Sequence, residues 1–143
     1  MKIGELASAA GCTNQTIRFY EREGLLPEPA RDASNYRYYH QTHLDRLRFI
    51  RNCRALVMSH EEIRSLLELM DRPLEECQPV EDLLENHVGH VEARIRELLQ
   101  LRSQLHELQR RCGHDRHVEN CGIVQGLAEM VTELPPRGST HLG

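Results

Sequence analysis

The stretch "TNQTIRFYEREGLLP", residues 13–27, decides the fold of the N-terminal part of the chain. It begins with Thr13, a residue type that caps helix N-termini, and it contains Gly24, a residue type that ends helices in a left-handed conformation. The residues between them predict a helix from about Asn14 to Glu23. A second short helix is expected just upstream, from Ile3 to Ala10, where a glycine interrupts the pattern. Two short helices joined by a tight turn that contains glycine predict a helix-turn-helix unit.

An extended segment and two further helices follow this unit. Residues 25–39, "LLPEPARDASNYRYY", hold two prolines and then alternating tyrosine and arginine, which favour a loop and a short hairpin, or wing. Apolar residues at helical spacing predict a helix from Thr42 to Arg54. Ser59 and Glu62 form the capping-box pattern that opens another helix, to about Met70.

The second half of the chain is dominated by one helical pattern, from Val80 to Arg111. At 1.5 Å per residue, a helix of this length extends ~48 Å. Its apolar stripe is too long to be buried on a small head, so it requires a partner helix, most simply from a second copy of the chain. The apolar residues that advance by three or four are Leu84, Val88, Val91, Ile95, Leu98, Leu101, Leu105 and Leu108.

The charge is distributed unevenly. Residues 1–54 contain 9 Lys and Arg against 6 Asp and Glu, whereas the remainder contains 9 against 16. A basic N-terminal part on an acidic body indicates a DNA-binding head with a separate effector or assembly region. No apolar run approaches the ~20 residues of a membrane span, and the N-terminal residues are too polar for a secretory signal, so we expect a cytoplasmic protein without a membrane partner.

The second helix of the head would be the recognition helix in the major groove of double-stranded DNA. Its early side chains can read bases, and the tyrosines and arginines of the wing are typical partners of phosphate and sugar. The alternative is that the apolar and aromatic members form the core and the arginines a solvated face. The candidate DNA-binding residues are Gln15, Thr16, Arg18, Tyr20, Tyr36, Arg37 and Tyr39.

The succession "IGELA", "TIRFYEREGLLP", "NYRYY", "RLRFI" and "EEIRSLL" resembles the winged-helix head of the MerR family of mercury-resistance regulators. The resemblance covers about residues 1–70, and the long helix and C-terminal loop extend it to about residue 131. It implies DNA contacts at Thr16, Arg18, Tyr20, Tyr36, Arg37 and Tyr39. Two departures stand out: Asn35 replaces the usual glycine before the wing tyrosine, and "LVMSHEEI" replaces the usual "LGFS" lead-in.

The five cysteines fall into two groups. Cys12 and Cys53 lie among apolar neighbours and are expected to be small buried residues. Cys77, Cys112 and Cys121 lie near the ends of the long helix. The helix extends ~48 Å from Val80 to Cys112, so Cys77 and Cys112 of one chain cannot share an ion. In an antiparallel pair of helices, however, Cys77 of one subunit meets Cys112 and Cys121 of the other. The family resemblance implies the same antiparallel coiled coil.

Three thiolates suit soft divalent ions: Pb²⁺, Cd²⁺, Hg²⁺ and also Zn²⁺. Within the family that the chain resembles, a cysteine at the place of Cys77 accompanies sensing of divalent ions. The C-x8-C spacing followed by "GIVQGL" is most similar to the lead- and cadmium-responsive branch. His117 matches a loop histidine of zinc-responsive members and is a candidate fourth ligand. His87 and His90, at positions i and i+3, form a candidate auxiliary site.

The sequence therefore predicts a mostly α-helical, metal-sensing transcriptional regulator and not an enzyme, since no nucleophile–base constellation or phosphate loop is present. The resemblance implies that a homodimer binds a palindromic operator and that the metal distorts the DNA so that RNA polymerase can use a resistance promoter. The parts expected are a winged helix-turn-helix domain at 1–70, a linker with Cys77 at 71–79, a dimerisation helix at 80–111, and a metal-binding loop, short helix and flexible tail at 112–143.

Three alternatives remain open at this stage. Cys112, His114, His117 and Cys121 could form a closed zinc knuckle within one chain, which gives Cys77 no role. A DNA-independent metal-buffering protein or metallochaperone would use the loop alone. A redox or small-molecule sensor could use the same head.

Overall fold

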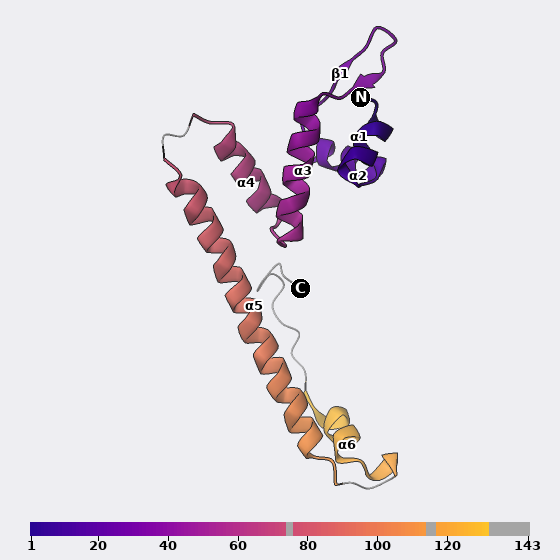
Figure 1. The fold of residues 1–143 in the computed structure, drawn as a ribbon. Helices are drawn as coiled ribbons and strands as arrows, with labels where there is room; N and C mark the ends of the chain where they lie inside the picture. The colour runs from indigo at the N-terminus through magenta and orange to yellow at the C-terminus, as the bar shows by residue number, and fades with distance from the viewer. Residues whose placement is uncertain (74–75, 114–116, 132–143) are drawn as a thin grey trace. The chain divides into compact units, whose positions relative to one another are not determined.

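The computed structural model describes residues 1–73, 76–113 and 117–131, which form two compact units, Met1–Leu84 and Glu85–Gly143 (Figure 1). The first unit holds α1 (Ile3–Ala10), α2 (Asn14–Arg22), β1 (Ala30–Arg31), β2 (Arg37–Tyr38), α3 (Gln41–Ala55) and α4 (His60–Met70). The helix α5 (Gln78–Arg110) begins in the first unit and ends in the second, which also contains the 3-10 turn η1 (Val118–Asn120) and α6 (Gly122–Glu129). The fold is mostly helical, as predicted.

Local capping residues set the helix boundaries of the first unit. The Thr13 hydroxyl accepts the backbone N–H of Thr16 at 3.1 Å, and Ser59 and Glu62 form the predicted capping box. Gly11 and Gly24 both have positive φ, 67° and 73°, which lets the chain turn sharply after α1 and α2. The predicted helix boundaries are thus confirmed to within two residues.

The wing is a two-stranded antiparallel hairpin in which Ala30 pairs with Tyr38 and Arg31 with Arg37. Its turn is closed by Asp32, whose carboxylate accepts the backbone N–H groups of Ser34 and Tyr36 at 2.9 and 3.0 Å. Asn35 has a φ of 65°, the left-handed conformation expected of the residue that replaces glycine here.

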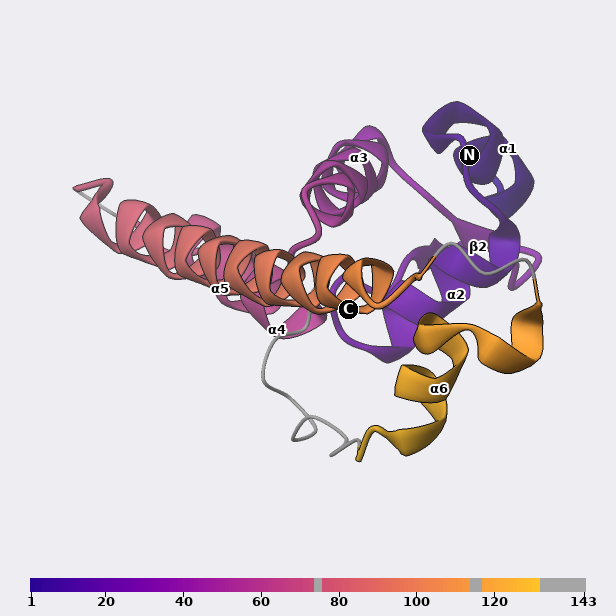
Figure 2. The same ribbon diagram turned by 90° about the horizontal axis from the view of Figure 1, so that it is seen from below.

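Figures 1 and 2 show the helices α1 to α4 of the first unit, and side chains from these helices form most of its core. Leu83, from the first turns of α5, packs against this core, so the unit extends past residue 70 to include the start of α5. Cys53 is buried, and burial raises the pKa of its thiol, as expected for a core residue rather than a ligand. The fully buried side chains are Leu6, Ile17, Leu25, Leu26, Tyr39, Leu47, Ile50, Met58, Ile63 and Leu67.

Several arginines of the first unit serve the fold rather than a ligand. Arg51 donates from Nη1 to the carbonyl oxygens of Ala10 and Gly11, and so satisfies the end of α1. Arg46 donates to the carbonyl oxygen of Leu25 at 2.9 Å and forms a two-pronged ion pair with Asp71 at 3.1 and 3.2 Å. That pair lowers the pKa of Asp71. The positive charge of the head is therefore partly structural.

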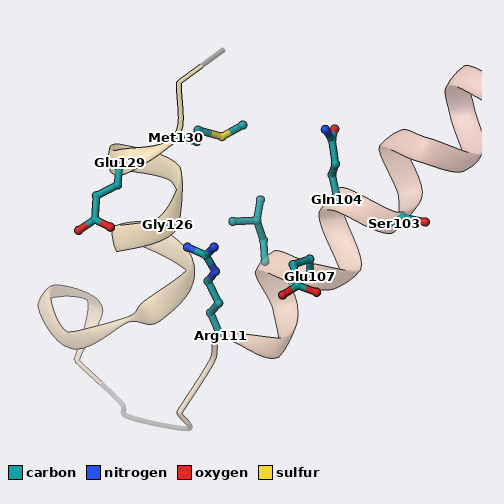
Figure 3. Close-up of a pocket in the computed structure, with 8 residues that line it drawn as sticks. Ser103, Gln104, Glu107, Arg111, Gly126, Glu129 and Met130 are labelled. Atoms are coloured by element: carbon teal, nitrogen blue, oxygen red, sulfur yellow. The ribbon is translucent and has the colours of Figure 1, made fainter. Parts of the chain in front are cut away.

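In the second unit, α6 packs beside the C-terminal end of α5 (Figures 1 and 3). The predicted short helix around Ile123 and Leu127 is confirmed as α6. The tail predicted to be disordered, "LPPRGSTHLG", lies outside the described residues, as does His114. None of the described helices combines the length and the apolar character needed to cross a membrane.

Candidate DNA-binding head and metal centre

The helix α2 presents one face to the core and the opposite face to solvent. Ile17 is fully buried, whereas Gln15 and Arg18 are exposed on the opposite side, as expected of a recognition helix. Thr16 is half-buried, and its hydroxyl oxygen lies 2.9 Å from that of Thr13. Gln15 and Arg18 are thus free to reach base edges, while Thr16 also takes part in the helix cap.

The wing exposes two of its tyrosines. The side chains of Tyr36 and Tyr38 are 65% and 46% exposed, and the ammonium of Lys2 lies 5.9 Å from the ring centroid of Tyr36. A lysine over an aromatic face is a favourable cation–π arrangement that places a positive charge beside the exposed ring. The wing thus combines aromatic rings and cations, which suits contact with phosphate and sugar.

Two predicted DNA contacts are buried instead. Tyr20 is 7% exposed and Tyr39 is 0% exposed, and both belong to the core of the first unit. Tyr39 has no accessible surface and Tyr20 has little, so in this conformation both tyrosines serve the core, and the predicted DNA contacts at these two positions stay predictions. Their physical role here is packing, which is the alternative that the sequence left open for Tyr20.

Glu21 connects the recognition helix to the wing. Its carboxylate accepts hydrogen bonds from Arg37 at 2.9 Å and from the hydroxyl of Tyr39. Burial of Tyr39 and this hydrogen bond raise its pKa to about 12, so the hydroxyl remains a donor at any physiological pH. A hollow of about 460 Å³ between helix and wing is lined by Gln15, Arg18, Glu21, Arg22 and Arg37.

The three candidate thiol ligands lie immediately outside helix ends. Cys77 directly precedes α5, its carbonyl oxygen accepts the N–H groups of Val80 and Glu81, and it is exposed. Cys112 follows the C-terminal end of α5, and Cys121 directly precedes α6; both are partly exposed. All three are free thiols. Cys77 belongs to the first unit, and Cys112 and Cys121 belong to the second.

The histidines of the predicted sites are placed differently from one another. His117 is exposed and directly precedes η1. His87 and His90 lie one turn apart on α5, with ring centroids 6.3 Å apart. Among the described residues, none of these cysteines belongs to a group of three or more ligand atoms that lie within 4.8 Å of one another in one chain.

Comparison with known proteins identifies the head and the long helix. A family profile described as "MerR HTH family regulatory protein" matches residues 1–69, and one described as "MerR, DNA binding" matches residues 44–108. The HTH-type transcriptional regulator ZntR homolog of Haemophilus influenzae is 48% identical over 108 residues, which are 76% of this chain and 80% of that protein. The chain belongs to the MerR family.

Two solved MerR-family structures match most of the chain. The transcription regulator PbrR691 from Ralstonia metallidurans, solved in complex with lead(II), is 49% identical with a TM-score of 0.80, over 89% of this chain and 98% of that one. MerR from Bacillus megaterium, solved in complex with mercury(II), is 30% identical with a TM-score of 0.74, over 90% of this chain and 100% of that one. These MerR-family relatives are transcriptional regulators, and the expectation of a DNA-binding regulator rather than an enzyme is confirmed.

The sequence did not single out two residues that the structure brings to the MerR-type head. Tyr38, the last residue of β2, is exposed, whereas Tyr39, which was expected to be exposed, is buried. Glu21 lies four residues after Ile17, on the side of α2 that also carries Tyr20. A carboxylate at a core-facing position of an amphipathic helix requires a hydrogen-bond or ion-pair partner. The position of Glu21 on the helix was therefore the signal in the sequence that could have predicted this contact.

Proposed function

We propose that the chain is a homodimeric, metal-responsive regulator that binds a palindromic operator and activates a metal-resistance promoter when Pb²⁺ or Cd²⁺ binds. The observation that carries the proposal is the placement of three free cysteines at the ends of α5, two of them in one unit and one in the other. The solved lead(II) complex of a protein 49% identical to this chain supports the choice of metal.

The donor set fits such an ion. Three thiolates match soft, thiophilic divalent cations, and all three thiols have accessible surface. Cys112 and Cys121 are close in sequence and can supply two ligands from one chain, but Cys77 is separated from Cys112 by the 33 residues of α5, a span of ~50 Å. A three-thiolate site therefore draws Cys77 from the partner subunit.

The apolar stripe of α5 supports an antiparallel pair with a defined register. In a pair of helices centred between Arg94 and Ile95, Cys77 lies opposite Cys112, and every apolar residue of the stripe except Ile95 and Leu108 lies opposite another apolar residue. From Leu84 to Leu105 the residues of the stripe are 38–53% exposed in the single chain, so the stripe has surface left to bury. The apolar pairs in this register are Leu84 with Leu105, Val88 with Leu101, and Val91 with Leu98.

The ion would act on the DNA-binding heads through α5. Cys77 belongs to the same unit as the head, and Leu83, six residues further on, packs against the head's core. An ion shared by Cys77 and the partner's cysteines would favour one arrangement of the two heads over another, by no more than its difference in affinity for the two. The resulting change in the bend and twist of the operator would let RNA polymerase use the promoter.

The choice among metals rests on the ligand set. Three thiolates alone favour Pb²⁺ or Cd²⁺, whereas participation of His117 favours Zn²⁺, which accepts mixed sulfur and nitrogen ligands. Hg²⁺ is the third candidate, since relatives of this chain include a mercuric resistance operon regulatory protein from Bacillus cereus, 36% identical over 126 residues. His87 and His90 would supply ligands to an auxiliary ion rather than to the thiolate site, because they lie ten and thirteen residues after Cys77, which is ~15 and ~20 Å along α5.

A titration of the full-length dimer tests this function. Pb²⁺, Cd²⁺, Zn²⁺ and Hg²⁺ are added in turn, the bound ions per dimer are counted, and transcription from the regulator's own promoter is measured in vitro with each metal. We expect two equivalent thiolate sites per dimer, activation by Pb²⁺ and Cd²⁺, and protection of Cys77 from alkylation. Metal binding that leaves Cys77 open to alkylation and transcription unchanged would instead support a metal-buffering protein.

A further inference from the structure

The helix α6 packs against the end of α5 through two glycines. Gly122 and Gly126 are four residues apart and therefore lie on one face of α6. Gly126 is buried, and Figure 3 shows it facing the side chain of Arg111, which reaches across from the end of α5. The contact lies wholly within the second unit.

The residues at and just after the end of α5 leave no room for a Cβ at these positions unless a neighbour moves. A Cβ on Gly122 would overlap the backbone carbonyl oxygen of Arg111 and lie 3.0 Å from its carbonyl carbon. A Cβ on Gly126 would lie 2.8 Å from Nη1 of Arg111 and 3.0 Å from Cδ2 of Leu108. Neither glycine has a positive φ, so space rather than backbone conformation is what requires glycine.

This contact is bracketed by two of the candidate ligands. Cys112 directly follows Arg111, and Cys121 directly precedes Gly122. The distance between the two backbones at the Arg111–Gly122 contact therefore governs the distance between the two thiols. Thiolates that share one ion must lie within about 4 Å of each other, given a metal–sulfur distance of ~2.3 Å for zinc. A shift of a few tenths of an ångström at this contact is significant on that scale.

We propose that Gly122 and Gly126 are positioning residues of the metal site, which set the separation of Cys112 and Cys121 by close packing of α6 on α5. The inference rests on the proposed function, because it assigns a role toward the same ion. Gly122 is the stricter position, since its neighbour is backbone. Gly126 is more tolerant, since the end of the Arg111 side chain can move aside.

The test is a Cd²⁺ titration of the reduced, full-length chain, in competition with a chelator and followed by thiolate-to-metal charge-transfer absorption. We expect Gly122→Ala to weaken Cd²⁺ binding at least tenfold and to reduce the absorption per bound ion, because fewer thiolates reach it. Gly113→Ala is the matched control: Gly113 directly follows Cys112, but a Cβ there meets nothing within 4 Å, so binding should stay within about twofold of wild type.

A double substitution separates positioning from a general effect on the helix. Gly126→Ala should weaken binding by less than Gly122→Ala, and adding Arg111→Ala should restore most of the loss for Gly126→Ala but none for Gly122→Ala. Alanine favours a helix over glycine, so weaker helix formation cannot explain a loss of affinity. The metal-free variants should bind the operator as tightly as the metal-free wild type does. Equal affinity would show that the DNA-binding head is intact.

The outcomes distinguish this inference from the proposed function. If wild type binds Cd²⁺ through three thiolates and Gly122→Ala binds it equally well, the positioning role is wrong. If wild type itself shows no three-thiolate absorption, the proposed metal site fails before the glycines are tested. A Gly122→Ala variant that does not fold leaves the Gly126→Ala and Arg111→Ala pair to decide, and absence of rescue in that pair overturns the proposal.

Discussion

At the level of single residues, the Glu21 carboxylate is the link between recognition helix and wing. Its side chain is only 8% exposed, and it accepts hydrogen bonds from Arg37 and from Tyr39. Breaking a buried, charge-assisted network of this kind costs about 1–3 kcal/mol, because the remaining donors lose their partner. The wing would then no longer be held in register with α2, and both elements carry candidate DNA contacts.

Glu21→Gln tests this link, because the loss of charge and the release of the wing would change operator affinity in opposite directions. If Glu21 acted only through its charge, removing a negative group beside DNA would raise operator affinity. We expect the reverse, a loss of about tenfold or ~1.4 kcal/mol, because the wing is released. The measurement is fluorescence anisotropy with a labelled operator at fixed salt. Glu23→Gln, at the exposed end of the same helix, is the control and should change affinity by less than about twofold. Equal or tighter binding by Glu21→Gln contradicts the positioning role.

Val57 holds a strained backbone conformation. Its φ is 61°, in the left-handed region that β-branched residues adopt only at a cost of about 1–2 kcal/mol. It stands in "LVMS", at the second position of the "LGFS" lead-in typical of the MerR family, where glycine would carry no such strain. The side chain is 46% exposed, so little packing is lost on its removal.

Val57→Gly should therefore stabilise the head. We expect the free energy of unfolding to rise by about 1 kcal/mol, measured by urea denaturation of the full-length protein. Leu56→Gly is the matched control, since Leu56 is also exposed but has a φ of −89°, where glycine only adds freedom to the unfolded chain. That control should lose stability. A loss in both variants would show that the left-handed turn is not strained.

At the level of elements, α5 determines how two copies would pair. An antiparallel pair centred between Arg94 and Ile95 places Ile95 near its own copy but separates the two Leu84 residues by about 30 Å, at 1.5 Å per residue. In a parallel pair, every residue would instead face its own copy. The two arrangements therefore predict very different distances between the two Leu84 residues, but both predict that the two Ile95 residues lie close together.

Thiol-directed cross-linking distinguishes these arrangements. In a background with Cys77, Cys112 and Cys121 replaced by serine, Ile95→Cys should cross-link with itself through a short bismaleimide. Leu84→Cys alone should not, but a mixture of Leu84→Cys and Leu105→Cys chains should give a mixed cross-linked dimer. The products are separated on a denaturing gel. Efficient self-cross-linking of Leu84→Cys would contradict the antiparallel register.

The helices were predictable because their signals are local. Thr13, Ser59 with Glu62, and the apolar spacing of α5 set boundaries through neighbours within four residues, and the structure agrees to within two residues. The burial of Tyr39 was not predictable in this way. It depends on where the chain turns after β2 and on a carboxylate 18 residues earlier in the sequence. Likewise, Arg51 donates to a carbonyl oxygen at the end of α1, 41 residues earlier in the sequence. Residue spacing alone therefore could not show that this arginine stabilises the fold rather than binding DNA.

The candidate metal site was predictable in part for a related reason. Free thiols at helix boundaries are a property of the local sequence, and all three cysteines lie where they were expected. The close approach of Gly122 to the Arg111 carbonyl is a tertiary contact that "GIVQGL" does not reveal by itself.

At the scale of the whole molecule, the proposed site belongs to the dimer rather than to either chain, and mixed dimers test this directly. Neither Cys77→Ser nor Cys112→Ser/Cys121→Ser should form a three-thiolate site as a homodimer. In a mixed dimer, however, Cys77 of the second variant would meet the intact Cys112 and Cys121 of the first, which restores one site of the two that symmetry gives the wild type. We expect co-expressed, doubly tagged heterodimers to bind one Cd²⁺ with the wild-type charge-transfer spectrum. A site confined to one chain would leave both halves of the heterodimer incomplete, so a heterodimer that binds no Cd²⁺ would refute the cross-subunit arrangement while wild type still binds.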